Sequence, residues 1–518
     1  MCGILFIFNH EYEVDQSVLK QRGPDSSKTI YTNNCACIFH RLRIMDNSDQ
    51  GDQPMVSGSV TMMCNGEIYN YRELIDEYEL ECKSHSDCEV ILHLYQKIGF
   101  VEMYKKLDGV FAIVLIDGDN IWVARDRVGV RPLFVGGNNN KVRGLCSLAG
   151  PLTKFCNQVE PILPNVCFSF SKSDDLIISK YIGTIPLYTD NPETHSFGNN
   201  ITKLNDILSQ AVKRQAVADR PIGCLLSGGL DSSIIATLLV RLLGANNVNT
   251  YSIGMEDSID VKYAEKMAAF LRTKHTTVRF TPQQGLDVIP KVIKALESYD
   301  VTTVRASVGM YLLCEYISKN TTDKVIFSGE GSDELFCGYL YFHNAPTPLH
   351  ASDESRRLVS ELYLYDVLRA DRTVSCHGLE LRVPFLDTKI VDFALSLPST
   401  HKSPINKWEK YMLRKAFETY LPKEIVWRRK NGFSDGVGSV KKPWYSYIQD
   451  FVNQRLADEL FDETKYLSKE AMYYKLIFTK EFPTYDPKIE PWLPKWSGDI
   501  KNPSGMLMGA FDENDTDK

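Results

Sequence analysis

The second residue of the chain, in MCGILFIFNH, combines two groups that could act together in catalysis. A small residue after the initiator methionine permits removal of Met1, which would leave Cys2 with both a thiol and a free α-amino group. The thiolate is the nucleophilic form, and an amine with a pKa of about 8 can accept a proton from a thiol with a pKa of about 8.5. Cysteine is also commonly buried as a small apolar residue, so its position alone favours a core role.

Four polar residues further along the chain could supply what amide hydrolysis at a thiol needs. The side chain of Asn65 and the backbone N–H of Gly66 could donate hydrogen bonds to a tetrahedral oxyanion. Arg41 could bind an α-carboxylate through two hydrogen bonds, and Asp87 could pair with an α-ammonium group. Each also has a structural interpretation, because Asn-Gly is typical of hairpin turns and Asp is favoured at the start of a helix.

A second candidate site follows the apolar run IGCLL, in the segment SGGLDSS at residues 227–233. The segment opens a predicted helix, so its backbone N–H groups would face an anion at the helix N-terminus. It lacks the Gly-Lys-Ser/Thr of a Walker A loop. Glycines that permit close approach and hydroxyl donors indicate a phosphate-binding loop formed by Ser227, Gly228, Gly229, Ser232 and Ser233.

Another strand-loop-helix pattern lies at SGEGSDE, residues 328–334. Ser, Asp and Glu are ordinary residues at a helix start, but Glu330 lies between two glycines, where an exposed carboxylate could act on an amine or orient a substrate. Arg305 and Arg382 are candidate partners for an acidic substrate, and Lys430 could neutralise a leaving pyrophosphate. The segment that begins at Lys430 is glycine-rich and is also compatible with a surface loop.

The predicted elements divide the chain into two domains. Residues 1–185 show mainly strands and turns, including a hairpin at FAIVLIDGDNIWVARD, and 186–200 form a linker without periodicity. Residues 201–510 show helices at 3.6-residue spacing and the strand-loop-helix units of an α/β fold. The acidic segment 511–518 is predicted to be a disordered tail.

Composition limits the function classes. With 518 residues, 43% hydrophobic and 24% charged, the chain is typical of a soluble globular protein with at least two domains. A net charge of −7, with no cluster of Lys and Arg, argues against nucleic-acid binding, and no apolar run is long enough to span a membrane. The 13 scattered cysteines indicate reduced thiols in the cytoplasm. The group of Cys82, His85 and Cys88 lacks a fourth ligand and favours structural residues over a zinc site.

Six segments in the first half, in order, resemble the class II N-terminal-nucleophile glutamine amidotransferases: QRGPD, HRLRIMD, NGEIYN, SDCEV, LDGVFAIVL and ARDRVGVRPLF. The resemblance implies an αββα sandwich in which Cys2 attacks the side-chain amide of glutamine. It also implies that Asn65 and Gly66 form the oxyanion hole, and that Arg41, Glu67 and Asp87 bind the polar ends of the substrate. The usual Glu before the arginine is replaced by His40.

The second half resembles the PP-loop ATP pyrophosphatases, and GLELRVPFLD, DVTTVRAS and FSDGVG extend the likeness to the asparagine synthetase family over nearly the whole chain. The family hydrolyses L-glutamine, activates L-aspartate with ATP as β-aspartyl-AMP, and transfers ammonia to it, with Mg²⁺ as cofactor. The resemblance implies Glu330 as the catalytic acid–base, Asp231 and Asp333 at the metal, and Thr302, Arg305 and Arg382 near aspartate. ATP would also be bordered by Leu226, Ser252, Ile253, Ser328 and Gly329. A homodimer is compatible with the resemblance.

Three other functions remain open at this point. The second half could amidate or cyclise another carboxylate. The chain could also be a catalytically silent sensor of an amino acid or a nucleotide, although that would be expected to damage Cys2, Asn65, Asp231 or Glu330, and all four are present. A scaffold that binds partners through its acidic tail is the third.

Overall fold

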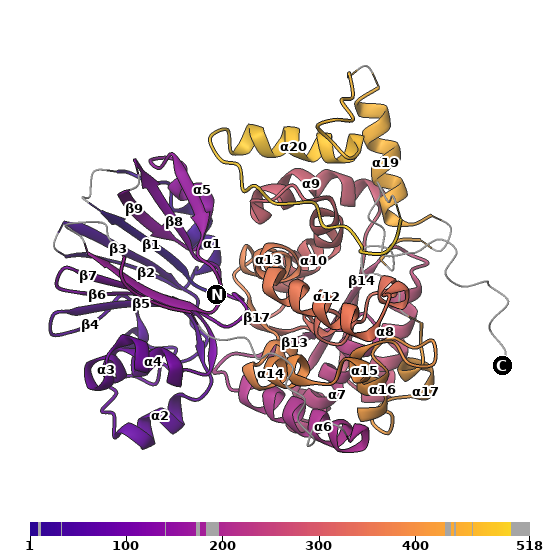
Figure 1. Cartoon of the computed structure of the whole chain (residues 1–518), viewed down its shortest axis with the longest axis horizontal. Helices are drawn as coiled ribbons and strands as arrows, with labels where there is room; N and C mark the ends of the chain where they lie inside the picture. Colours follow the sequence, from indigo (N-terminus) through magenta and orange to yellow (C-terminus); the bar gives the residue numbers. More distant parts are fainter. Residues whose placement is uncertain are drawn as a thin grey trace.

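The computed structural model describes residues 1–8, 12–32, 34–139, 141–171, 177–182, 196–429, 437–439, 442–457 and 459–498. Two units lie side by side: a β-rich unit that ends in the described residues at Ile182, and a larger, helix-rich unit from Ser196 onward (Figure 1). The predicted tail 511–518 and the predicted linker residues 186–195 lie outside the described residues. Within the described part of the chain, no helix is long and apolar enough to cross a membrane.

The β-rich unit contains two six-stranded sheets in which all the recorded pairings are antiparallel. The first sheet has the order β10 (Gln158–Pro161), β8 (Phe134–Asn138), β9 (Lys141–Cys146), β1 (Gly3–Phe8), β3 (Cys35–Arg41), β2 (Ser26–Thr32). The second has the order β12 (Ile177–Ile182), β11 (Val166–Ser171), β7 (Asn120–Arg125), β6 (Gly109–Asp117), β5 (Val60–Ile68), β4 (Met55–Ser57). The predicted hairpin is confirmed, with Asp117 opposite Asn120.

The two sheets pack face to face over a core that includes Phe6, Phe39, Met63 and Val114. On the outer side of the second sheet, α2 (Tyr71–Tyr78), α3 (Glu89–Ile98) and α4 (Phe100–Lys106) bury Leu74, Leu94 and Met103 against it. On the first sheet, α1 (Ser17–Arg22) packs on β1 and β3, and α5 (Ala149–Leu152) packs on β8 and β9. The unit is therefore the αββα sandwich that the sequence predicts. Strand β1 is central and buried at every position, which explains its uninterrupted apolar run.

The helix-rich unit is built on a five-stranded parallel sheet with the order β15 (Lys274–Arg279), β14 (Asn249–Gly254), β13 (Ile222–Leu225), β16 (Val325–Phe327), β17 (Glu380–Arg382). The strand order reverses on either side of β13, because the chain first adds strands on one side and then crosses to the other. In open α/β sheets, ligands bind at such a switch point, beyond the carboxyl ends of the strands. The ends of β13 and β16 lead directly into the two predicted site loops.

The remaining elements of this unit are helices. They are α6 (Phe197–Gln215), α7 (Leu230–Leu243), α8 (Ile259–Leu271), α9 (Pro282–Leu296), α10 (Val301–Asn320), α11 (Ser332–Leu335), α12 (Pro348–Glu361), α13 (Asp366–Ser375), α14 (Thr388–Ser396), α15 (Ser399–Lys402), α16 (Tyr411–Ala416), α17 (Lys423–Val426), α19 (Trp444–Arg455) and α20 (Lys469–Glu481). Short 3₁₀ turns occur in this unit at Ala245–Asn247, Leu340–Asn344, Leu362–Leu364 and Pro384–Leu386, and in the first unit at Asp49–Gly51.

Helix α6 begins inside the segment that the sequence predicted to be linker. The side chain of Ser196 accepts a hydrogen bond from the backbone N–H of Asn199, which satisfies one of the free donors of the first turn and starts the helix at Phe197. The sequence does not predict this helix start, because the Gly-Asn-Asn that follows Phe197 consists of poor helix formers without apolar residues at helical spacing.

The possible zinc ligands of the first unit separate in the fold. Cys88 Sγ donates to the Gly66 carbonyl oxygen at 3.6 Å, whereas Cys82 groups with Glu89 and His93, with ligand atoms within 4.8 Å of one another. The Glu89 carboxylate already accepts the backbone N–H groups of Lys83 at 2.8 Å and Ser84 at 2.7 Å. These contacts support the structural interpretation of the group.

Candidate active sites

The thiol of Cys2 lies at the start of β1, among groups from several elements. The Cys2 backbone N–H donates to Asn65 Oδ1 at 2.8 Å, and Sγ lies 3.8 Å from the Leu42 carbonyl oxygen. Burial raises the pKa of the thiol. Met1 is buried against the second unit, where its ammonium group donates to the Leu379 carbonyl oxygen at 3.4 Å, and burial lowers the pKa of that group to about 6.

Asn65 has the geometry expected of an oxyanion-hole residue. It lies on β5 and is fully buried, and its Oδ1 is occupied by the Cys2 N–H. Its Nδ2 is buried without a hydrogen-bond partner among the described residues. A buried amide donor is almost always paired, so a free one beside a thiol indicates a ligand-binding role. At Gly66, a Cβ would lie 2.2 Å from the Val110 carbonyl oxygen, so only glycine fits there.

Two of the predicted ligands for the charged ends of glutamine, Asp87 and Glu67, lie near this site, and each has its own partner. Asp87 accepts the Ile68 N–H at 2.6 Å, and burial raises its pKa to about 6. Glu67 forms an ion pair at 3.2 Å with Arg382, which comes from the second unit, and burial raises the Glu67 pKa. The two carboxylates therefore form one buried acidic group at the edge of β5.

Arg41 is placed differently from the prediction. Its Nη1 donates to the Ser48 carbonyl at 2.9 Å and to Asp52 Oδ1 at 2.7 Å. Its Nη2 donates to the Met45 and Asp46 carbonyls at 2.8 and 2.7 Å. Both terminal nitrogens thus hold the loop at 45–52 in place, and the role of Arg41 at a substrate carboxylate stays a prediction.

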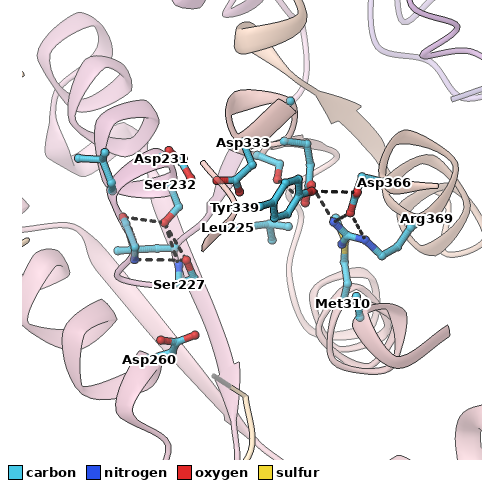
Figure 2. Close-up of a pocket in the computed structure, with 18 of the residues that line it drawn as sticks. Leu225, Ser227, Asp231, Ser232, Asp260, Met310, Asp333, Tyr339, Asp366 and Arg369 are labelled. Atoms are coloured by element: carbon cyan, nitrogen blue, oxygen red, sulfur yellow. Dashed lines mark hydrogen bonds and ion pairs between the residues drawn. The ribbon is translucent and has the colours of Figure 1, made fainter. Parts of the chain in front are cut away.

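The second site is a cavity of about 230 Å³ at the switch point of the parallel sheet. Its walls include these residues predicted from the sequence: Leu226, Ser227, Gly229, Asp231, Ser232, Ser252, Ile253, Thr302, Ser328, Gly329, Glu330 and Asp333. Figure 2 shows Ser227, Asp231 and Ser232 on one side of the cavity and Asp366 and Arg369 on the other. The structure thus brings together residues that are more than a hundred positions apart.

The phosphate-binding loop has the predicted form. Gly228 has φ of +72°, and a Cβ there would lie 2.4 Å from the backbone nitrogen of Ala264. The Ser227 and Ser232 hydroxyls are 3.0 Å apart. Helix α7 starts after Gly229 without a side-chain cap, so its N-terminal N–H groups and dipole remain available to an anion.

Lys410 is the main functional candidate that the sequence did not reveal. Its Nζ lies 2.6 Å from Asp231 Oδ2 and 2.7 Å from Asp333 Oδ1, and its side chain is only 1% exposed. In the sequence it stands in NKWEKY, which carries no recognisable motif. The lysine therefore joins the phosphate-binding loop to the SGEGSDE loop.

The opposite side of the cavity carries a network around Glu330. Arg369 Nη2 donates to Glu330 Oε2 at 2.7 Å and to Asp366 Oδ1 at 3.0 Å. Tyr339 donates to Glu334 Oε1 at 2.6 Å. Burial raises the Glu330 pKa, and Arg369 opposes this shift by favouring the carboxylate.

Four predicted residues do not line the cavity. Arg305 is 2% exposed and donates through Nε to Glu470 at 2.7 Å. Arg382 binds Glu380 at 2.7 Å and the Gln215 carbonyl at 2.8 Å, at the boundary with the first unit. The structure therefore gives both arginines partners outside the cavity, and their role toward the acidic substrate stays a prediction. Gly228 packs against the backbone of Ala264, and Ser233 is buried in α7. Lys430 lies outside the described residues.

Comparison with known proteins assigns both units. A family model described as Glutamine amidotransferase domain matches residues 1–158, and one described as Asparagine synthase matches residues 203–359 and 347–480. The chain is 42% identical to the Asparagine synthetase [glutamine-hydrolyzing] of Gallus gallus over 99% of both chains. The chain belongs to the asparagine synthetase family.

Mammalian members of the family show the same likeness. The enzymes of Mus musculus and Homo sapiens are each 41% identical to the chain, over 96% of both chains. Among solved structures, a glutamine phosphoribosylpyrophosphate amidotransferase from B. subtilis has a TM-score of 0.30 and 16% identity, and covers 47% of this chain and 64% of its own. The assignment rests on the family models and the full-length asparagine synthetase relatives.

Proposed function

We propose that the chain makes L-asparagine from L-aspartate, with L-glutamine as nitrogen donor and ATP as energy source. The observation that carries the proposal is the presence of two candidate sites in one chain. The Cys2 backbone N–H is bonded to Asn65, whose amide donor is buried without a partner among the described residues, and a separate cavity joins the predicted phosphate-binding loop to Lys410 and Glu330.

In the first site, Cys2 attacks the side-chain amide of glutamine after removal of Met1. The Cys2 nitrogen, which already lies 2.8 Å from Asn65 Oδ1, becomes the amine that accepts the thiol proton. The free Nδ2 of Asn65, with Gly66 beside it, stabilises the oxyanion. Ammonia leaves, and water hydrolyses the thioester to glutamate. Glu67 and Asp87 bind the α-ammonium group, and the loop held by Arg41 receives the α-carboxylate.

In the second site, Ser227, Ser232 and the N-terminus of α7 bind the pyrophosphate of ATP while the β-carboxylate of aspartate attacks the α-phosphate. Lys410 offsets the negative charge that develops on the leaving pyrophosphate. A free carboxylate is a poor electrophile, and conversion to the acyl-AMP gives it a good leaving group. Ammonia then displaces AMP to form the amide.

Two carboxylates in this cavity fit a magnesium ion. Asp231 and Asp333 both line the cavity and both lie within 2.7 Å of Lys410 Nζ, so the two carboxylates are close together and a Mg²⁺ ion would bind beside the ammonium group, on the side of the cavity. Carboxylate oxygens are the ligands that Mg²⁺ prefers, usually together with substrate phosphates. When bound there, Mg²⁺ would neutralise the phosphate oxygens of ATP. Ser332 donates to Asp231 Oδ1 at 2.8 Å and so orients this carboxylate.

Glu330 is the proposed base that takes a proton from the attacking ammonia. It lines the cavity, and its pairing with Arg369 at 2.7 Å favours the ionised form against the effect of burial. Thr302 lines the same cavity and is the remaining candidate contact for aspartate among the three predicted residues.

Two further parts of the proposal are the location of the enzyme in the cell and its oligomeric state. All 13 cysteines are among the described residues and none forms a disulfide, which supports a cytoplasmic location because disulfides are rare in reducing compartments. A homodimer stays a prediction.

The test is mass spectrometry of the products from amide-¹⁵N-glutamine, aspartate and MgATP, with AMP and pyrophosphate measured in the same reaction. Labelled asparagine with an equal amount of AMP is the expected result. Labelled ammonia without asparagine or AMP would support the Cys2 site alone, contradict aspartate as the acceptor, and direct the search to another carboxylate. Turnover of neither substrate would indicate a catalytically silent sensor.

A further inference from the structure

Helix α13 lies between the two active sites and presents a different face to each. Arg369 donates to Glu330 in the synthetase cavity at 2.7 Å. Asp371 follows two residues later and points to nearly the opposite side of the helix, and Ser375 lies one turn beyond it on the same face. Asp371 and Ser375 are therefore directed toward the amidotransferase unit.

A single arginine of the first unit binds both residues. Arg22 Nη1 donates to Asp371 Oδ2 at 2.8 Å and to Ser375 Oγ at 2.7 Å, and Nη2 lies 3.4 Å from Asp371 Oδ1. The Nε of the same guanidinium donates to the carbonyl oxygen of Cys2 at 2.9 Å. The side chains of Arg22 and Asp371 are 1% and 2% exposed, so water does not compete for these bonds.

The Arg22 guanidinium couples the positions of Asp371 and Ser375 to that of Cys2, because the group is planar and rigid. Its donors form a fixed fork, so holding Nη1 and Nη2 in place also fixes the direction of the Nε–H bond. That bond fixes the carbonyl of Cys2, one bond from the Cα that carries the thiol. Helix α1, which ends with Arg22, has only six residues and offers little rigidity of its own. The anchor of the nucleophile therefore lies in the other unit.

We propose that Asp371 and Ser375 are positioning residues for the Cys2 nucleophile, so that the glutamine site is complete only when the synthetase unit is docked against it. The proposal deepens the proposed function and rests on it, because it takes Cys2 as the nucleophile. Neither residue contacts the predicted glutamine ligands, so their effect falls on the turnover of bound glutamine.

The test uses the full chain with Asp371→Asn or Ser375→Ala. Hydrogen bonds to charged groups correspond to factors of about 10 to 100, so we expect glutaminase kcat to fall about tenfold with Ser375→Ala and about 100-fold with Asp371→Asn. The KM for glutamine should stay within about twofold, as should asparagine synthesis from added ammonium. The combination of a lower kcat, an unchanged KM and intact ammonia-dependent synthesis is not expected from a general loss of structure.

Asp392→Asn is the matched control. Arg127 and Asp392 form another ion pair between the two units, but neither touches a site, so both activities should persist. Full glutaminase activity in the Asp371 and Ser375 variants would overturn the proposal, and so would an equal loss of ammonia-dependent synthesis. Glutaminase that survives Cys2→Ala would instead refute the proposed nucleophile.

Discussion

Replacement of Asn65 by alanine tests the glutamine site most directly, because Asn65 has one bonded and one free amide atom. Oδ1 accepts the Cys2 N–H at 2.8 Å, while Nδ2 is buried without a partner in the described structure. Loss of one oxyanion-hole donor lowers kcat by about 10² to 10³, which corresponds to about 2.7–4 kcal/mol of transition-state stabilisation. We expect this loss in glutamine hydrolysis, with asparagine synthesis from added ammonium unchanged.

The same substitution has an unusual expected effect on stability. Loss of Oδ1 leaves the Cys2 N–H without an acceptor, at a cost of about 1–3 kcal/mol, but the substitution also removes the buried unsatisfied Nδ2, whose own penalty is about 1–3 kcal/mol. The two contributions nearly cancel, so the free energy of unfolding of Asn65→Ala should stay within about 1 kcal/mol of wild type, apart from the small cavity. The variant should lose activity without losing much stability.

Asn70→Ala is the matched control, since it removes the same side chain from the same NGEIYN segment. Its Nδ2 donates to the Lys106 carbonyl at 2.9 Å and its Oδ1 accepts the Asp108 N–H at 2.9 Å, so both amide atoms are used structurally. It should lower the midpoint of urea unfolding and retain glutaminase activity. The reasoning fails if Asn65→Ala is destabilised as much as Asn70→Ala and keeps kcat within tenfold of wild type.

Three further predictions concern other groups. Glu330→Gln should stop asparagine synthesis from both glutamine and ammonium while glutaminase persists; ammonia-dependent synthesis above a tenth of wild type would contradict its role. Lys410→Met should lower kcat/KM for ATP at least 100-fold, since a buried cation between two carboxylates is lost, and spare glutaminase; unchanged ATP kinetics would exclude it from the site. Burial lowers the pKa of His40 to about 4, so the neutral imidazole contributes stability that is complete above pH 6.5 and is lost as the pH falls from 6.5 to 4. In urea unfolding, the stability of His40→Gln should therefore change less over this pH range than that of wild type. An equal change in both proteins would refute this contribution of His40.

Much of the fold follows from local patterns in the sequence. Strand β1 and the β6–β7 hairpin are recognisable because their apolar runs and turn residues act between near neighbours. The phosphate-binding loop is recognisable for the same reason, because its glycines and hydroxyls follow one another in a single turn. The start of α6 was missed because a single serine cap outweighs the unfavourable Gly-Asn-Asn that follows it.

The sequence by itself predicts the nucleophile, the oxyanion donor, the phosphate-binding loop and the carboxylate between two glycines, because each needs only a residue type in a local conformation. Only the tertiary structure decides which distant side chains contact these groups. It placed Lys410 between Asp231 and Asp333, and it buried Arg305 against Glu470 away from the cavity. It also anchored Arg22 on α13. These contacts join residues far apart in the chain, and the charge of an arginine or lysine does not specify which distant carboxylate it will meet until packing brings the two together.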